Sequence, residues 1–277
     1  MSKSLSLVLD PYDRGARLYP ALIATFPVFV ALTILLPHFL GRDLMTAMLS
    51  LVTGCGMLVL VTHLARDAGR AKELGWYQMQ GGKPSVAMLR HRDGRLTRED
   101  KVRYHRFLTG RASDAPLPSP EVEAMNPIEA DATYAAAATW LLAQTRDKAR
   151  FELLFRRNID YGFRRNLTAL RGVALCLDGM IALGVLGMIA GAHLGALSAK
   201  AMPATSSMVM ILIISLAHAA LVWRVLRPAW VAAAAEDYAR QLFAACDVLG
   251  PTGGTATSTS QRAVVKKRVD KGRVGQA

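Results

Sequence analysis

The most regular feature of this sequence is a set of four long apolar runs separated by polar or charged segments. The runs cover residues 21–40, 44–64, 172–197 and 206–223. A helix needs about 20 mostly apolar residues to cross the hydrocarbon core of a bilayer, and the runs have about that length. The pattern therefore predicts an all-α integral membrane protein with four transmembrane helices.

The spacing of the runs predicts two helical hairpins. Residues 41–43 alone separate the first two runs, and a short loop whose single charge is Lys200 separates the last two. The segment between the hairpins, residues 65–171, is long enough to form a small core of its own. We expect a helical cytoplasmic domain there, preceded by a cytoplasmic N-terminal segment at residues 1–20.

The distribution of Lys and Arg sets the expected orientation. Of 34 such residues, 20 lie in 65–171, 9 lie from Arg224 onward and 3 lie in residues 1–20, whereas each short loop has one. By the positive-inside rule, both termini and the large insert are cytoplasmic. The net charge of +13 is too large for an ordinary soluble domain. We therefore expect a multi-pass protein of a bacterial inner membrane, without a cleavable signal peptide.

Start and stop signals divide the insert into helices. Thr97 precedes acidic residues and predicts an N-cap, and the helix that follows is expected to stop at Gly110. Asn126-Pro127 is a second start signal, with proline at the first helical position. A third helix, from about Asp147, is expected to run nearly continuously into the third apolar run and to be loosened at Gly162.

The chain after the fourth run predicts a cytoplasmic amphipathic helix within residues 224–249. From Pro228 onward its apolar positions, mostly alanine, form one stripe. Alanine favours close helix packing over insertion into lipid, so we expect this stripe to dock on the alanine-rich helix at 129–144. Residues 250–277 are rich in Gly, Thr and Ser and then in basic residues, which predicts a disordered basic tail.

A doubled basic box, FRRN at 155–158 and again at 163–166, lies just before the third run. It indicates either a basic helix that contacts anionic lipid headgroups or a site for a phosphorylated ligand or partner. Nucleic acid is disfavoured, because no nucleic-acid-binding module is recognisable. The candidate binding residues are Arg150, Arg156, Arg157, Asn158, Tyr161, Arg164, Arg165 and Asn166.

Two polar residues within the apolar runs are a second candidate site. Asp178 and His218 are expected at similar depths on the third and fourth spans, and we predict that they pair, with Thr25 as a third member. The pair is interpreted as a contact that fixes helix packing, and a proton or ion path is the alternative.

Three glycines, Gly187, Gly191 and Gly195, repeat at a spacing of four residues in the third run. Such a small-residue face lets helices approach closely. It predicts either a packing seam with a neighbouring span, which we favour slightly, or a contact in a homo-oligomer.

The cluster Arg90, His91, Arg92 and Asp93 is a third candidate site. It is interpreted as a solvated charged turn, and the alternative is acid–base chemistry by His91 and Asp93. The three cysteines have no metal-ligand spacing, so no metal, cofactor or disulfide is expected. Signatures of zinc proteases, serine hydrolases and nucleotide-binding loops are absent, which argues mildly against an enzyme.

Together these patterns favour a membrane-anchored cytoplasmic interaction or sensing module. Its basic helix would bind anionic lipid, a phosphorylated ligand or an unidentified cytoplasmic partner. One alternative is an oligomeric channel or membrane-perturbing effector gated by the cytoplasmic domain. The second alternative is a lipid-modifying membrane enzyme.

Overall fold

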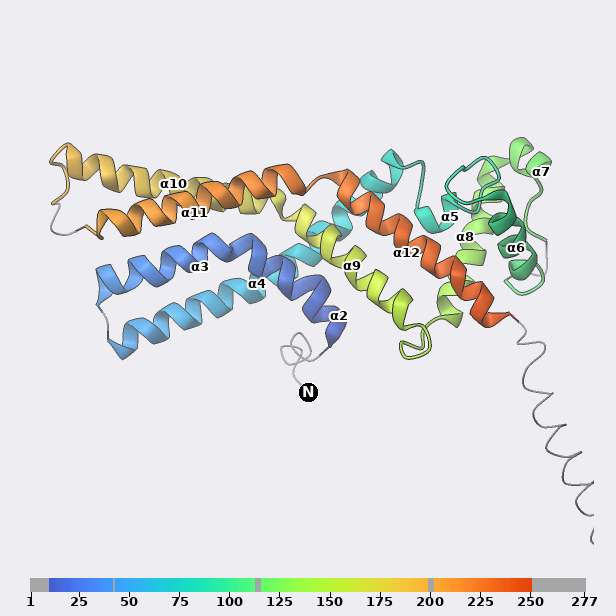
Figure 1. Ribbon diagram of the computed structural model, residues 1–277, viewed down its shortest axis with the longest axis horizontal. Helices are drawn as coiled ribbons and strands as arrows, with labels where there is room; N and C mark the ends of the chain where they lie inside the picture. Colours follow the sequence, from blue (N-terminus) through green and yellow to red (C-terminus); the bar gives the residue numbers. More distant parts are fainter. Residues whose placement is uncertain (1–9, 42, 113–115, 199–201, 251–277) are drawn as a thin grey trace, which may run out of the picture. The chain divides into compact units, whose positions relative to one another are not determined.

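The computed structural model describes residues 10–41, 43–112, 116–198 and 202–250. Within these ranges the regular elements are helices, with no β-strand (Figure 1). Four of the described helices are long and apolar enough to cross a membrane. The predicted all-α class is therefore confirmed for the described residues, and the four apolar helices suggest a multi-pass membrane protein. Of the predicted disordered tail, residues 251–277 lie outside the described residues.

The chain divides into two compact units. The first contains the residues up to Pro84 together with Glu152–Tyr238. The second contains Ser85–Phe151 and the chain from Ala239 onward. The four candidate spans lie in the first unit, and so do both ends of the segment that joins the hairpins.

The spans form two hairpins, as the spacing of the apolar runs predicts. They are α3 (Tyr19–Leu40), α4 (Leu44–Met79), α10 (Arg171–His193) and α11 (Thr205–Val225). α3 contacts α4, and α10 contacts α11, while α3 also contacts both helices of the second hairpin (Figure 1). The third span ends earlier than predicted, at His193, because Gly195 turns the chain with a φ of 70°.

α4 is much longer than the predicted span 44–64. It has 36 residues and ends at Met79, so at 1.5 Å per residue it is about 54 Å long. The hydrocarbon core of a bilayer is only about 30 Å thick. The last turns of α4 therefore extend beyond the apolar part of the bundle, and they carry the polar residues Lys72, Glu73 and Tyr77.

The N-terminal residues form α2 (Pro11–Asp13) and a short π-helix, η1 (Arg14–Leu18), which pack against α9 (Glu152–Ala169). Glycines permit this close approach. A Cβ atom at Gly162 of α9 would lie 2.8 Å from the Cβ of Ala16. A Cβ atom at Gly15 would lie 2.6 Å from a methyl group of Ile159. The two backbones are therefore closer than two ordinary side chains allow.

Replacing Gly162 by alanine is expected to lower the free energy of unfolding by about 1–3 kcal/mol, because the new methyl group pushes η1 away from α9. The matched control is Gly172→Ala on α10, where a Cβ atom meets nothing within 4 Å. That change is expected to be neutral or to stabilise by up to about 1 kcal/mol through helix propensity. Unfolding in mixed detergent micelles measures both, and an equal response of the two variants contradicts the close contact.

α9 and α10 are separated by one residue, Leu170, whose φ of −77° and ψ of −4° end the regular helix. The predicted loosening at Gly162 is wrong, since α9 runs unbroken through it. Gly162 lies at the close contact of α9 with Ala16. Leu170 is instead buried in an apolar cluster with Ala21, Val61 and other residues of the spans.

α12 (Pro228–Leu249) has the predicted bounds of the amphipathic helix. In its first turns Val231 and Ala235 pack in a cluster with Trp76 of α4 and with Tyr161 and Ala169 of α9. The expected partner of the alanine stripe was the helix at 129–144. For these first turns the partners are α4 and α9 instead, whose small and aromatic side chains fit the alanines.

The second unit is built from short helices together with the last turns of α12. They are α5 (Pro84–Ala87), α6 (Arg98–Leu108), α7 (Pro120–Met125) and α8 (Pro127–Gln144). Both predicted N-caps are confirmed. The Thr97 hydroxyl accepts from the Asp100 N–H at 3.1 Å, and the Asn126 amide oxygen accepts from the Glu129 N–H at 3.4 Å. The predicted stop is confirmed by Gly110, which has a φ of 73°.

Candidate functional site

The second copy of the basic box forms a buried polar network on α9. Glu73 of α4 accepts hydrogen bonds from the Tyr161 hydroxyl at 2.5 Å and from the Tyr77 hydroxyl at 2.9 Å. The Arg165 guanidinium donates to the same carboxylate at 3.0 Å, and its side chain is only 11% exposed. This network joins α4 to α9, and it engages two of the candidate binding residues, Tyr161 and Arg165, within the protein.

Asn166 ties the same part of α9 to the N-terminal helix. Its amide nitrogen donates to the Ala16 carbonyl oxygen at 2.6 Å, and its amide oxygen accepts from Arg165 at 3.2 Å. A Cβ atom at Gly69 would lie 2.3 Å from that amide oxygen. Lys72 also donates to the Ala169 carbonyl oxygen at 3.1 Å. Asn166 is therefore a structural residue where α4, α9 and η1 meet.

The first copy of the box is more exposed. Arg156 pairs with Glu152 one turn earlier at 2.6 Å, and its side chain is 71% exposed. Arg157 lies 3.5 Å from Asp237 and is 45% exposed. Exposed ion pairs of this kind contribute little to stability, so these guanidinium groups can exchange partners at little cost. Asn158 beside them is half-buried.

Two Arg–Trp stacks lie near one end of the bundle, the first at the start of α10 and the end of α11 and the second between α9 and α12. The Arg171 guanidinium lies 4.4 Å from the ring centre of Trp223, and Trp223 is 62% exposed. Arg164 lies 5.2 Å from the ring centre of Trp230 and pairs with Asp160 at 3.0 Å. Stacked arginine and tryptophan are typical of the interface between membrane and water. In the second unit Arg150 donates to the Val248 carbonyl oxygen at 3.2 Å.

Asp178 and His218 are brought together between the spans, where both are buried. The His218 Nδ1 lies 2.8 Å from one carboxylate oxygen of Asp178. The His218 Nε2 lies 3.0 Å from the carbonyl oxygen of Ile23 on α3. That carbonyl lacks its usual helical partner, because the residue four positions later is Pro27, which has no N–H. The histidine therefore links three spans.

The hydrogen bonds also orient the imidazole ring. A carbonyl oxygen can only accept, so the His218 Nε2 carries a proton and donates it to Ile23. The Nδ1 then faces the carboxylate of Asp178. Thr25, the expected third member, bonds instead to the Ala21 carbonyl oxygen at 2.8 Å. With both ring nitrogens engaged, the arrangement has the geometry of a packing contact between helices.

Gly187, Gly191 and Gly195 do not form one seam. A Cβ atom at Gly187 would meet nothing within 4 Å, and at Gly191 it would meet the side chain of Leu197 at 2.6 Å. Gly195 lies past the end of the helix, where it supplies the left-handed turn. The expected seam with a neighbouring span is therefore not made at these positions, since one faces open space and two serve the turn.

The cluster at residues 90–93 forms a dense network in the second unit. The Arg90 guanidinium makes two bonds of 2.7 Å to Asp131, and Arg92 pairs with Glu123 at 2.9 Å. Glu123 is 2% exposed and also accepts from the backbone N–H of His91 at 2.7 Å. Burial raises the pKa of this carboxyl group, but the hydrogen bonds outweigh it and the net shift is downward.

Two further groups complete this network. Lys101 is buried, and its ammonium donates to the carbonyl oxygens of Arg90, His91 and Asp93. Burial lowers the pKa of Lys101 and also that of His105, whose Nε2 lies 2.8 Å from the Leu89 carbonyl oxygen. The charged turn is thus held in a defined conformation by side chains of α6, α7 and α8, while Arg92 remains 46% exposed.

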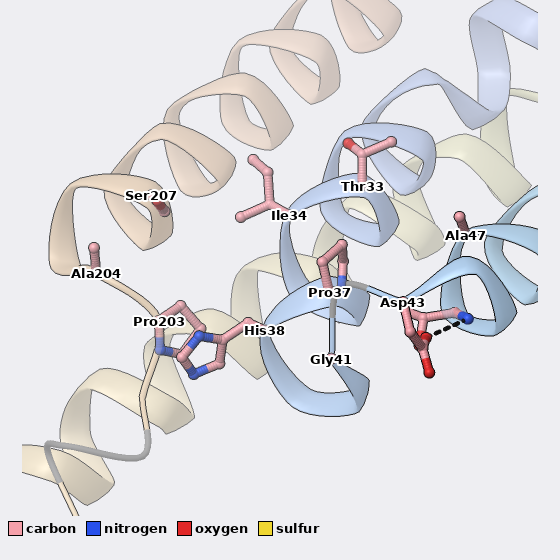
Figure 2. A pocket seen from close by; sticks show the side chains of 11 residues that line it. Thr33, Ile34, Pro37, His38, Gly41, Asp43, Ala47, Pro203, Ala204 and Ser207 are labelled. Carbon is pink, nitrogen blue, oxygen red and sulfur yellow. Dashed lines mark hydrogen bonds between the residues drawn. The ribbon is translucent and has the colours of Figure 1, made fainter.

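Several cavities among the described residues are large enough for a small molecule. One of about 690 Å³ lies at the loop end of the bundle, lined by α3, α11 and the residues before α4, including His38, Asp43 and Ser207 (Figure 2). One of about 570 Å³, almost wholly apolar, lies between α3 and α11 beside His218. The third, of about 580 Å³, lies in the second unit. No group of three or more metal-ligating side chains is found in the part of the chain that the structure describes.

Sequence reasoning missed Glu73, Tyr77 and the Ile23 carbonyl. The first two continue the helical pattern of the second apolar run beyond its end, and Pro27 is the signal for the third, since it frees the carbonyl four residues earlier. In comparisons with known proteins, no family model, curated protein or solved structure matches this chain.

Proposed function

We propose that this chain is a multi-pass membrane protein that acts as a membrane-anchored sensing and interaction module. Its arginine-rich end faces the cytoplasm, in line with the positive-inside distribution of Lys and Arg. There α9 and the ends of the spans bind anionic lipid headgroups. The observation that carries the proposal is the pair of Arg–Trp stacks, Arg171 with Trp223 and Arg164 with Trp230.

The position of each arginine along the helices assigns it a partner. Arg164 lies seven residues before Arg171, or about 10 Å along a helix. Arg157 lies fourteen residues before it, or about 21 Å. The headgroup region extends about 5–7 Å beyond the hydrocarbon core on each side, and charges on a surface act over a further distance of about 8 Å at physiological salt. Headgroup contact is therefore assigned to Arg164 and Arg171, and contact with a cytoplasmic partner to the exposed Arg156 and Arg157.

Helical continuity gives this module a route for a signal. Leu170 alone interrupts the path from α9 into α10, and the network around Glu73 joins α9 to α4. The first turns of α12 belong to the first unit, and its last turns belong to the second, where Phe243 stacks on Tyr104. Because α9 leads directly into α10, a partner that shifts α9 would also displace the start of α10, near the buried Asp178.

The double variant Arg164→Gln, Arg171→Gln is expected to lower affinity for phosphatidylglycerol on the order of 30-fold, since each charge near an anionic surface contributes about 1 kcal/mol. The measurement is the rise in melting temperature as phosphatidylglycerol is titrated into protein held in neutral detergent. The matched control is Arg106→Gln, Arg146→Gln, which removes two exposed charges from the second unit. The control is expected to keep the lipid response of the wild type. If the Arg164→Gln, Arg171→Gln variant also keeps it, the proposal fails.

A further inference from the structure

A cavity of about 580 Å³ in the second unit has no role in the function proposed above. Its polar lining consists of His91, Asp93, Arg98 and Lys101. This volume lies within the range of about 300–1,000 Å³ that is usual for small-molecule sites. The chemistry of an occupant follows from which of these four side chains are already bonded to the protein.

Two of the four are fully engaged. The Asp93 carboxylate accepts from the Arg95 guanidinium, with bonds of 3.0 and 3.1 Å to the Arg95 Nε. Its negative charge is therefore neutralised. The Lys101 ammonium donates to three backbone carbonyl oxygens, which uses its three N–H groups. Neither group is available to a ligand, and the cavity does not favour a cation.

Arg98 differs from both. It is exposed, and it has no ion-pair partner among residues 10–41, 43–112, 116–198 and 202–250. The next cavity along α6, of about 470 Å³, is lined by the same Arg98 together with Glu99, Arg103 and Arg106. Arg103 pairs with Asp100 at 2.8 Å. Arg98 thus lines both cavities without an ion-pair partner of its own among the described residues, and its planar fork of donors suits phosphate oxygens.

The remaining lining residues indicate what kind of group could lie beside the phosphate. The His91 Nε2 lies 3.0 Å from the Pro118 carbonyl oxygen, so that nitrogen donates to the protein and not to a ligand. Leu96 and Pro120 add an apolar surface to the same cavity. The lining therefore pairs one free cation with an apolar wall, which suits a ligand with an anionic head and a small apolar body.

We propose that this cavity binds a small organic phosphate, with the phosphate on Arg98 and the organic group against Leu96 and Pro120. The site goes beyond lipid binding at α9 and does not depend on it. It would give the second unit a soluble ligand of its own.

The test uses the full chain in a neutral detergent, so that no lipid headgroup competes, with phenyl phosphate as the probe and calorimetric titration as the measurement. Saturable binding is expected for the wild type, and Arg98→Gln is expected to weaken it at least tenfold. The matched control Arg146→Gln removes an exposed charge elsewhere in the second unit and should bind like the wild type. Melting temperatures verify that both variants are folded.

Benzyl alcohol, which has the same ring without a phosphate, provides the second arm and is expected not to bind. Equal binding of benzyl alcohol and phenyl phosphate overturns the assignment of an anionic head. Unchanged affinity in Arg98→Gln, or the absence of phenyl phosphate binding to the wild type, overturns the site itself. The result of the lipid titration with Arg164→Gln, Arg171→Gln does not change any of these outcomes. The two proposals can therefore fail separately.

Discussion

Replacing His218 by leucine is expected to destabilise the bundle by about 3–5 kcal/mol, because it removes one partner of a buried, hydrogen-bonded pair. Two groups lose their partner at once. Asp178 is left in an apolar surrounding at 2% exposure, and the Ile23 carbonyl, already freed by Pro27, loses its only replacement donor among the described contacts. The measurement is the free energy of unfolding in mixed detergent micelles, with Leu216→Ala on the exposed face of α11 as the control.

Two further variants separate the two losses. Pro27→Ala restores an N–H to the helix, so the Ile23 carbonyl regains its ordinary partner and the cost of His218→Leu should fall. Adding Asp178→Leu removes the stranded acid, and apolar replacements of a whole buried pair are often neutral. The triple variant is therefore expected to approach wild-type stability. If His218→Leu costs less than about 1 kcal/mol, or if Pro27→Ala leaves its cost unchanged, the three-helix link is wrong.

Features of the fold that depend on local sequence were predictable. Apolar runs of sufficient length predict the candidate spans, because the hydrocarbon core offers no hydrogen-bond partners and a helix satisfies its own backbone groups. The caps at Thr97 and Asn126 follow from side chains that bond their own helix, and the stop at Gly110 follows from a backbone conformation that glycine adopts without strain. None of these requires knowledge of what packs against the segment.

Features that depend on partners far apart in the chain were not predictable. A helical wheel places Arg164 and Arg165 on different faces, but it does not reveal that Glu73 accepts from Arg165 while Trp230 stacks on Arg164. The end of α4 was set too early for the same reason. Its polar last turns are stabilised by contacts with α9, which a hydropathy window cannot detect. From the sequence alone, Gly162 predicted a loosened helix, whereas in the structure it allows α9 to pack closely against Ala16.

The candidate sites show the same division. That Asp178 and His218 meet could be inferred from their depths in two spans. That the third partner is a backbone carbonyl, and not Thr25, required the position of α3. The stripe of glycines was misjudged because spacing alone does not distinguish a packing face from a helix end, where Gly195 lies.

Replacing Glu73 by alanine is expected to cost about 3–5 kcal/mol of unfolding free energy, because it strands a buried guanidinium. Glu73 is the acceptor for Arg165, for Tyr161 and for Tyr77, and Arg165 keeps only a bond of 3.2 Å to Asn166 without it. Removing both charges in Glu73→Ala, Arg165→Met should recover much of the loss. The interaction energy between the two positions, from a double-mutant cycle, is the quantity to measure.

Glu152→Ala supplies the matched control. It breaks the pair of Glu152 with Arg156, which lies within α9 and is shorter, at 2.6 Å, but exposed to solvent. Its expected cost is about 0.5 kcal/mol or less. The contrast tests the division of labour within the doubled box. If burial makes the difference, the second FRRN is part of the framework that fixes α9 to α4, and the first, with its exposed Arg156 and Arg157, is left for binding. Equal costs at Glu73 and Glu152 would mean that both copies are surface features, and the assignment of partner binding to the first copy would lose its basis.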